Sequence, residues 1–201
     1  MQAARGTSIG TAATDGSRRR RAILLFVLVA LTAYAVDQVT KVVAVAELEG
    51  RSDVQVLGDL LQLNLVRNPG AAFSIGTSLT PLLSALAAVA ALTVLWLSRR
   101  LGSKLWAVGL GLLLAGVLGN LTDRVLRAPG AFRGHVIDFL QLPNWPIFNV
   151  ADICINVAAG LIILQAFRGI RLDGTRESDL PDPPDPTDQE AVEADPDKDS
   201  Q

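Results

Sequence analysis

Four long apolar stretches constrain the fold of this chain more than any other feature of its sequence. They cover about 22–46, 80–98, 105–125 and 147–167. Each is close to the roughly 20 residues that a helix needs to cross a hydrocarbon core of about 30 Å. Half of the 201 residues are apolar, which is high for a soluble domain of this size. The sequence therefore predicts an all-α membrane protein with four transmembrane helices.

Four helices place both chain termini on one side of the membrane, and flanking cations indicate which side. Cytoplasmic loops usually carry the excess of Lys and Arg. The ends that would then be cytoplasmic carry Arg18 to Arg21, Arg99, Arg100, Lys104, Arg168 and Arg171. Fewer cations fall on the outer segments, so we expect both termini to be cytoplasmic. An alternative is that the first apolar stretch, with Ala33-Tyr34-Ala35, is a secretory signal peptide, although the stretch continues beyond that point.

The two outer segments, 48–79 and 126–146, differ in pattern. Between 61 and 66, leucine alternates with Gln, Asn and Val, the period of a strand that has one face on an apolar surface. We expect a small extracytoplasmic β-sheet here, between the first and second helices, with a loosely ordered loop as the alternative. The second outer segment contains three prolines and is expected to be irregular.

The membrane domain, 22–171, is flanked by two segments of different composition. Residues 1–21 begin with a stretch rich in Gly, Ala, Ser and Thr, where burial is too small to offset the entropy cost of ordering. Residues 172–201 combine five prolines with many Asp and Glu, a composition that cannot build a core. We expect a flexible cytoplasmic tail at the first end and a disordered acidic cytoplasmic tail at the second.

Ionisable residues are costly inside a membrane, so those near the apolar stretches are functional candidates. They are Asp37, Lys41, Asp123, Arg124, Asp138 and Asp152. On the deduced topology all six approach the outer membrane boundary and predict a polar pocket there. The same level holds Gly70 and the amides Asn68, Asn120 and Asn149. The alternative is that Asp37 with Lys41, and Asp123 with Arg124, are charge pairs that only hold helices together.

That alternative leaves Asp138 and Asp152 without an evident cationic partner. Two carboxylates held within about 3 Å cannot both ionise easily, so they share one proton, and one activates water while the other polarises a carbonyl. This is the chemistry of aspartyl proteolysis. A Ser or Cys mechanism would depend on the single His135, and Cys154 is better explained as a packing residue. One Cys and one His also argue against a zinc site.

Five short motifs follow one another along the chain. They are VDQVTK at 36–41, RNPGAAFS at 67–74, GNLTDR at 119–124, GHVIDF at 134–139 and FNVAD at 148–152. Together, in order and spacing, they closely resemble the motifs of lipoprotein signal peptidase, also called signal peptidase II. The resemblance covers roughly residues 22–168.

The resemblance implies a four-helix bacterial membrane protease that removes signal peptides from prolipoproteins, cutting before a cysteine that carries diacylglycerol. By motif, Asp138 and Asp152 would be its catalytic aspartates. Substrate-binding or supporting roles would fall to Asp37, Lys41, Asn68, Gly70, Asn120, Asp123, Arg124 and Asn149. The family uses no metal and no organic cofactor. The sheet and the loop around Phe73 are expected to close over the substrate as a lid.

The expected partners are diacylglyceryl prolipoprotein substrates and membrane lipid, with no nucleic acid, and the expected state is a monomer. The expected location is the bacterial cytoplasmic membrane, with the active site at the extracytoplasmic face. Two other functions remain open, namely a transporter that moves protons or ions through buried carboxylates, and a noncatalytic membrane scaffold. A transporter predicts acids that are spread through the membrane depth, whereas these acids lie near one face.

Overall fold

The computed structural model describes residues 9–70 and 80–179 of the chain. Phe73 and the rest of 71–79 therefore lie outside the described residues, as do 1–8 and 180–201. The described residues form α1 (Ile9–Leu48), β1 (Val54–Leu57), β2 (Leu61–Asn68), α2 (Thr80–Ser98), α3 (Lys104–Leu126), β3 (Val136–Gln141), α4 (Val150–Phe167) and the short 3₁₀ helix η3 (Glu177–Asp179).

The four long helices form a bundle in which α3 packs against each of the other three. All four are long and apolar enough to cross a membrane, which confirms the prediction of four transmembrane helices. Side chains such as Leu28 and Leu92 remain more than 60% exposed on the outside of the bundle, as expected for surfaces that face lipid rather than water. The chain is therefore a multi-pass membrane protein.

Two glycines of α3 allow the neighbouring helices to approach its backbone closely. A Cβ atom added at Gly116 would lie 2.5 Å from the carbonyl oxygen of Ala151, at the start of α4. A Cβ atom at Gly119 would collide with the carboxylate of Asp37, on α1. Glycine removes this steric barrier, so α1, α3 and α4 converge at one level of the bundle.

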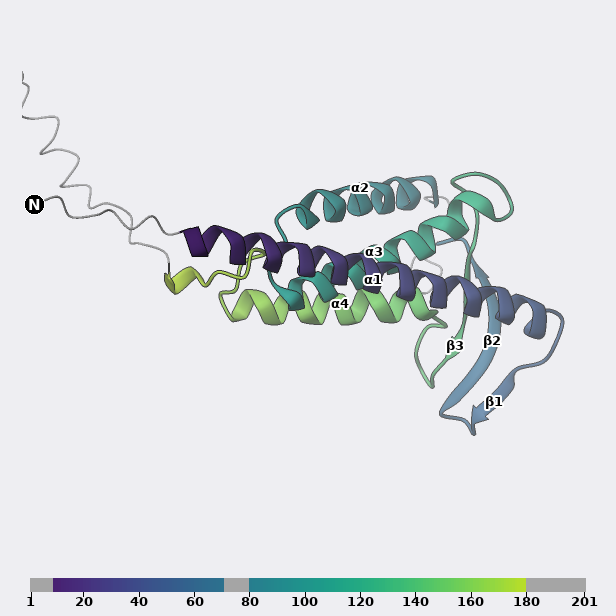
Figure 1. The fold of residues 1–201 in the computed structure, drawn as a ribbon. Helices are drawn as coiled ribbons and strands as arrows, with labels where there is room; N and C mark the ends of the chain where they lie inside the picture. The colour runs from purple at the N-terminus through teal and green to yellow at the C-terminus, as the bar shows by residue number, and fades with distance from the viewer. Residues whose placement is uncertain (1–8, 71–79, 180–201) are drawn as a thin grey trace, which may run out of the picture.

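A three-stranded antiparallel sheet, in the order β1-β2-β3, lies at one end of the bundle (Figure 1). The expected strands between the first two helices are present, so the loosely ordered loop is not found for 54–57 and 61–68. The prediction of an irregular segment 126–146 was wrong, because β3 completes the sheet from within it. The three prolines of that segment flank β3 and do not interrupt it.

The sheet packs on the C-terminal end of α1. Ile137 and Phe139 of β3 are buried in a cluster with Ala44 and Leu48 of α1. Because side chains alternate along a strand, Asp138 must point to the other face of the sheet, toward α3 and α4. Packing of the apolar face therefore determines where this carboxylate is directed.

Both flanking segments contain more structure than composition predicts. Helix α1 begins at Ile9, well before the apolar stretch that starts at 22, because a helix can continue through polar and basic residues once it has been nucleated. At the other end, the Leu172 carbonyl accepts hydrogen bonds from the backbone N–H groups of Gly102 and Ser103. Residues 172–179 are thus ordered against the α2–α3 turn, unlike the disordered tail expected from 172 onward. Figure 1 shows that the start of α1 and η3 lie together, at the end of the bundle opposite the sheet.

Candidate active site

The register of β2 and β3 brings Asn68 beside Asp138. Asn68 pairs with Val136, and Val66 pairs with Asp138, so all four side chains project from the same face of the sheet. The Asn68 Nδ2 atom donates a hydrogen bond of 2.9 Å to Asp138 Oδ2. One carboxylate oxygen of Asp138 is therefore fixed by a neighbouring strand.

The second candidate carboxylate, Asp152, belongs to the first turn of α4. Asn149 is the N-cap of this helix, and its side chain accepts a hydrogen bond from the backbone N–H of Asp152 at 3.1 Å. Asp152 Oδ2 in return accepts a hydrogen bond from the backbone N–H of Asn149 at 3.1 Å. This reciprocal pair is a capping box, so the orientation of Asp152 is determined by the way α4 begins.

Two asparagines connect Asp138 and Asp152. Asn149 Nδ2 donates to Asp138 Oδ1 at 2.6 Å, and Asn120 Nδ2 donates to Asp152 Oδ1 at 2.9 Å. The asparagines are themselves joined, because Asn149 Nδ2 also donates to Asn120 Oδ1 at 3.2 Å. Within the described part of the chain, the two carboxyl groups form no hydrogen bond with each other. Both groups line one cavity.

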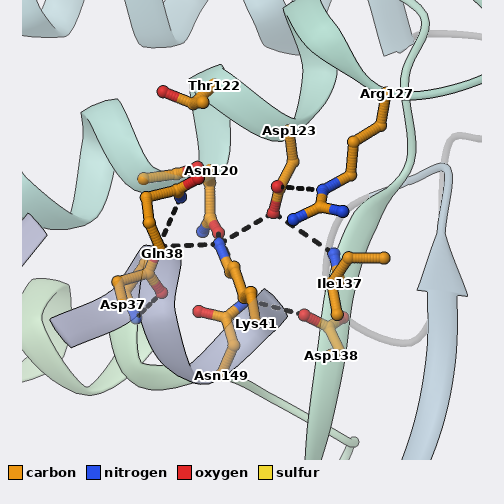
Figure 2. A network of polar contacts seen from close by, with 12 residues as sticks. Asp37, Gln38, Lys41, Asn120, Thr122, Asp123, Arg127, Ile137, Asp138 and Asn149 are labelled. Carbon is orange, nitrogen blue, oxygen red and sulfur yellow. Dashed lines mark hydrogen bonds and ion pairs between the residues drawn. The ribbon is translucent and has the colours of Figure 1, made fainter. Parts of the chain in front are cut away.

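Lys41 is fully buried at the centre of the polar layer (Figure 2). Its ammonium has three N–H donors and three acceptors lie within reach. They are Asp37 Oδ2 at 3.0 Å, Asp123 Oδ2 at 2.8 Å and Asn120 Oδ1 at 3.0 Å. Because Asn120 Oδ1 accepts a hydrogen bond from Lys41, the Nδ2 atom of Asn120 faces Asp152. Lys41 therefore orients one of the groups that hold the candidate pair.

The two acids bound to Lys41 each hold the backbone immediately before a candidate carboxylate. Asp37 Oδ1 accepts a hydrogen bond of 2.8 Å from the backbone N–H of Ala151, the residue before Asp152. Asp123 Oδ2 accepts one of 3.3 Å from the backbone N–H of Ile137, the residue before Asp138. One buried cation thus supports both members of the candidate pair through matching contacts.

A cavity of about 580 Å³ lies against this layer and is lined by both Asp138 and Asp152. Its size is typical of a ligand pocket. Polar residues line one part, and the remainder is apolar, formed by Val136, Trp145, Pro146, Ile147, Phe148, Ile153 and Val157. The arrangement can hold an apolar molecule and present a polar group of that molecule to the two carboxylates.

Arg124 reaches the same cavity and connects it to the β2–α2 segment. Its Nη2 atom donates a hydrogen bond of 3.0 Å to the Gly70 carbonyl oxygen, and Gly70 N–H donates to Asn68 Oδ1 at 2.9 Å. Its Nη1 atom is buried and has no hydrogen-bond partner among the described residues. A buried guanidinium nitrogen without a hydrogen-bond partner is costly, and a bound ligand could satisfy it.

Burial raises the pKa of the Asp138 carboxyl from its ordinary 3.8 to about 6. The hydrogen bond from Asn68 acts in the opposite direction by stabilising the carboxylate, and the nearby charge of Asp152 raises the pKa further. Asp138 can therefore hold or release a proton near neutral pH. This property suits a general acid.

The structure brings all ten predicted site residues into one connected region, but it changes one pairing. Asp123 pairs with Lys41 and with Arg127 Nε, and does not form the suggested pair with Arg124. Sequence reasoning missed Arg127, although the spacing of four residues from Asp123 on one helix would have indicated it. It also missed Gln38, whose Nε2 donates to Asp37 Oδ2 at 2.9 Å and to the Gly119 carbonyl oxygen at 3.2 Å.

His135 and Cys154 take no part in the hydrogen bonds of this layer described above. His135 does not line the cavity, and its backbone N–H donates to the Ala128 carbonyl oxygen. Cys154 is buried and free, in agreement with a packing role. Within the described residues, no group of three His, Cys, Asp or Glu side chains is arranged to hold a metal ion.

A family match and the similar proteins of known name agree with one another. Residues 29–168 match the family described as Signal peptidase (SPase) II. A lipoprotein signal peptidase of Leifsonia xyli subsp. xyli is 49% identical over 159 residues, which cover 79% of this chain and 74% of that protein. A lipoprotein signal peptidase of Rhodococcus jostii is 45% identical over 168 residues, which cover 84% of each chain.

The fold is also found among solved structures. Two structures described as a bacterial membrane enzyme, determined by the in meso method at 2.3 and 1.9 Å resolution, each match with a TM-score of 0.63 and 27% identity. The matches cover 71% of this chain in both cases, and 87% and 92% of the respective solved chains.

Proposed function

Because this chain belongs to the signal peptidase II family, we propose that it removes signal peptides from diacylglyceryl prolipoproteins, with Asp138 and Asp152 as its catalytic pair. The observation that carries the proposal is the cavity that both carboxylates line, with Asn149 and Asn120 linking the two groups behind it. The transporter and scaffold alternatives are not favoured, because the family and the named relatives are peptidases.

The two carboxyl groups take different roles at the start of the proposed reaction. Asp138 holds the shared proton, since burial raises its pKa. Asp152 starts as the carboxylate, because the backbone N–H of Asn149 and the positive end of the α4 dipole both stabilise an anion at this position. A water molecule between the two groups is the nucleophile.

Proton transfers then follow in two steps that return the pair to its starting state. The water oxygen adds to the scissile carbonyl carbon as Asp152 takes a proton from the water. At the same time Asp138 donates its proton to the carbonyl oxygen. The C–N bond then breaks as Asp152 passes its proton to the leaving amine. Asp138 recovers a proton from one hydroxyl of the tetrahedral intermediate as the C=O bond re-forms.

The cavity supports this assignment of the substrate. Its apolar wall, formed in part by Ile147, Phe148 and Val157, fits an apolar signal segment next to the scissile bond. The Nη1 atom of Arg124, which has no hydrogen-bond partner among the described residues, is available to a main-chain carbonyl of the substrate. No group supplied by a second protomer is needed for this geometry, so we propose that the chain acts as a monomer.

We also propose that the catalytic layer faces the extracytoplasmic side of the bacterial cytoplasmic membrane. The start of α1 and the α2–α3 turn lie at the end of the bundle away from the sheet (Figure 1). These two segments carry Arg18 to Arg21, Arg99, Arg100 and Lys104. Cations at that end favour a cytoplasmic location. Both ends of the described chain lie there, whereas the sheet and Asp138 lie at the opposite end.

The test of the proposed function is cleavage of a purified diacylglyceryl prolipoprotein compared with the same protein carrying an unmodified cysteine. We expect the lipidated form to be cut at least about 100-fold faster, because burial of acyl chains contributes binding energy that the unmodified peptide lacks. Mass spectrometry should place the cut directly before the lipidated cysteine. Equal cleavage of both forms, or a cut elsewhere, would contradict the proposed substrate.

Removing the Asn68 donor should shift the pH dependence of cleavage. Cleavage requires a proton on Asp138 in the free enzyme, so kcat/KM should fall as pH rises through about 6. In Asn68→Leu the carboxylate loses a stabilising hydrogen bond, the pKa of Asp138 rises, and the falling limb should move upward by about one pH unit. The matched control is Asn64→Leu on the same strand, whose amide binds Gln141. If the falling limb of the pH profile stayed at the same pH in Asn68→Leu, the protonation of Asp138 would not be the step that limits activity at high pH.

A further inference from the structure

A second cavity, of about 520 Å³, lies at the opposite end of the bundle from the carboxylate pair. It lies between the start of α1, the α2–α3 turn and the segment that follows α4. Three cations line it, namely Arg18, Arg21 and Lys104, and no acidic side chain is found among the described residues of its lining. Asp173, in an adjacent turn, is engaged by hydrogen bonds from Thr175. The cavity is therefore strongly electropositive.

The start of α3 adds a second attraction for an anion. Ser103 is the N-cap of α3, yet its side chain makes no capping hydrogen bond to the first turn. Its hydroxyl instead accepts a hydrogen bond of 3.3 Å from Gln165 Nε2. The first-turn N–H groups and the positive end of the α3 dipole consequently remain available beside Lys104 and Leu105, both of which line the cavity.

Gln165 is a second, independent indication that the cavity binds a ligand. It lines the cavity, is only 1% exposed and lies near the end of α4, where its sequence neighbours are apolar. Its Oε1 atom has no hydrogen-bond partner among the described residues. A buried acceptor without a donor costs free energy. The terminal torsion of Gln is soft and the bond to Ser103 is long, so a small rotation would turn this oxygen toward a donor in the cavity.

The cavity lies at the depth of the lipid headgroups. Arg21 directly precedes Ala22, where the first apolar stretch begins, and Arg18 lies three residues before Arg21 on the same helix, so the cations lie at the boundary between hydrocarbon and water. A lipid phosphate occupies this boundary permanently, whereas a free phosphate has to be captured from solution. Basic pockets between helices at this boundary are suited to anionic headgroups.

From these observations we infer that this cavity binds the headgroup of an anionic phospholipid whose alcohol carries free hydroxyls, as in phosphatidylglycerol. The phosphate diester lies among Arg18, Arg21 and Lys104 at the start of α3. A headgroup hydroxyl donates to Gln165 Oε1. The site is separate from the carboxylate pair, so it does not depend on the proposed function.

The test is native mass spectrometry of the full-length chain titrated with three lipids. Phosphatidylglycerol should bind about tenfold more tightly than zwitterionic phosphatidylcholine, because the cations attract the phosphate diester. It should bind about fivefold more tightly than phosphatidylmethanol, which has the same single charge but no hydroxyl. Equal binding of phosphatidylglycerol and phosphatidylmethanol by the unaltered chain would overturn the role of Gln165 without any need for a variant.

Variants separate this site from general attraction to the basic face. Arg18→Gln combined with Arg21→Gln should weaken phosphatidylglycerol binding about tenfold. The matched control, Arg168→Gln combined with Arg171→Gln, removes the same charge at the same end outside the cavity lining and should change little. Gln165→Leu should abolish the difference between phosphatidylglycerol and phosphatidylmethanol. Equal losses in the two Arg pairs would overturn the site, and displacement of the lipid by millimolar inorganic phosphate would show that it binds a free phosphate instead.

Discussion

Asp138→Asn and Asp152→Asn should each lower kcat for cleavage of a diacylglyceryl prolipoprotein by about three orders of magnitude. Asparagine keeps the size of the side chain but cannot exchange a proton. At position 152 the amide oxygen can still accept the hydrogen bond from the Asn149 N–H, so α4 should begin as before. The measurement is single-turnover cleavage by variants that are present in membranes at equal levels.

A matched control and a double variant make this prediction specific. Asp59→Asn makes the same chemical change at an exposed position between β1 and β2, and its activity should remain within about twofold of the unaltered chain. The double variant Asp138→Asn with Asp152→Asn should be no slower than either single variant, because residues that act as a unit are not additive. Substantial activity in either single variant would remove that residue from the catalytic pair.

Lys41→Met should have the largest effect on stability, at about 3–5 kcal/mol, because it leaves two buried carboxylates without their shared cation. Asp37 and Asp123 are both fully buried beside Lys41. Cleavage should also fall, since Asn120 loses the donor that orients its amide toward Asp152. Unfolding of the purified protein in mixed micelles would measure the loss of stability.

Adding Asp37→Asn to Lys41→Met should recover part of the lost stability. In that double variant Asp123 still has its ion pair with Arg127, so neither of the two former partners of Lys41 is left as an unpaired buried charge. The matched control is Val42→Met, next to Lys41 on α1 but 60% exposed, where methionine should change stability by less than about 0.5 kcal/mol. If Lys41→Met proved as stable as this control, Lys41 would not be the centre of the layer.

The helices and the polar layer could be predicted from sequence because both depend on local patterns. Apolar length alone defines the four helices, and an ionisable residue near such a stretch is conspicuous. Strand β3 could not be predicted in the same way. Its stability comes from pairing with β2, about 70 residues earlier in the chain, and from packing on Ala44 and Leu48. Neither contact is visible in the local sequence around its flanking prolines.

The charge pairs show a second limit of sequence reasoning. Asp123 and Arg124 are adjacent, so on a helix their side chains point in different directions. Arg127, one turn later, reaches Asp123 instead. The bond between Asp123 and Lys41 joins α3 to α1, and it depends on the close approach of the two helices at Gly119. Pairs within one helix follow from spacing, whereas pairs between helices follow from packing.

The length of α1 links catalysis to the thickness of the membrane. The helix from Arg21 to Lys41 spans about 30 Å, which is close to the thickness of the hydrocarbon core. On the proposed orientation, one continuous helix therefore places its cations at the inner boundary and the carboxylate layer at the outer one. In a thicker bilayer both cannot be at the boundaries unless the lipid thins locally, at a cost of a fraction of a kcal/mol per Å. On the proposed function and orientation, the scissile bond would thus be selected by its depth in the bilayer as well as by the peptide and its lipid.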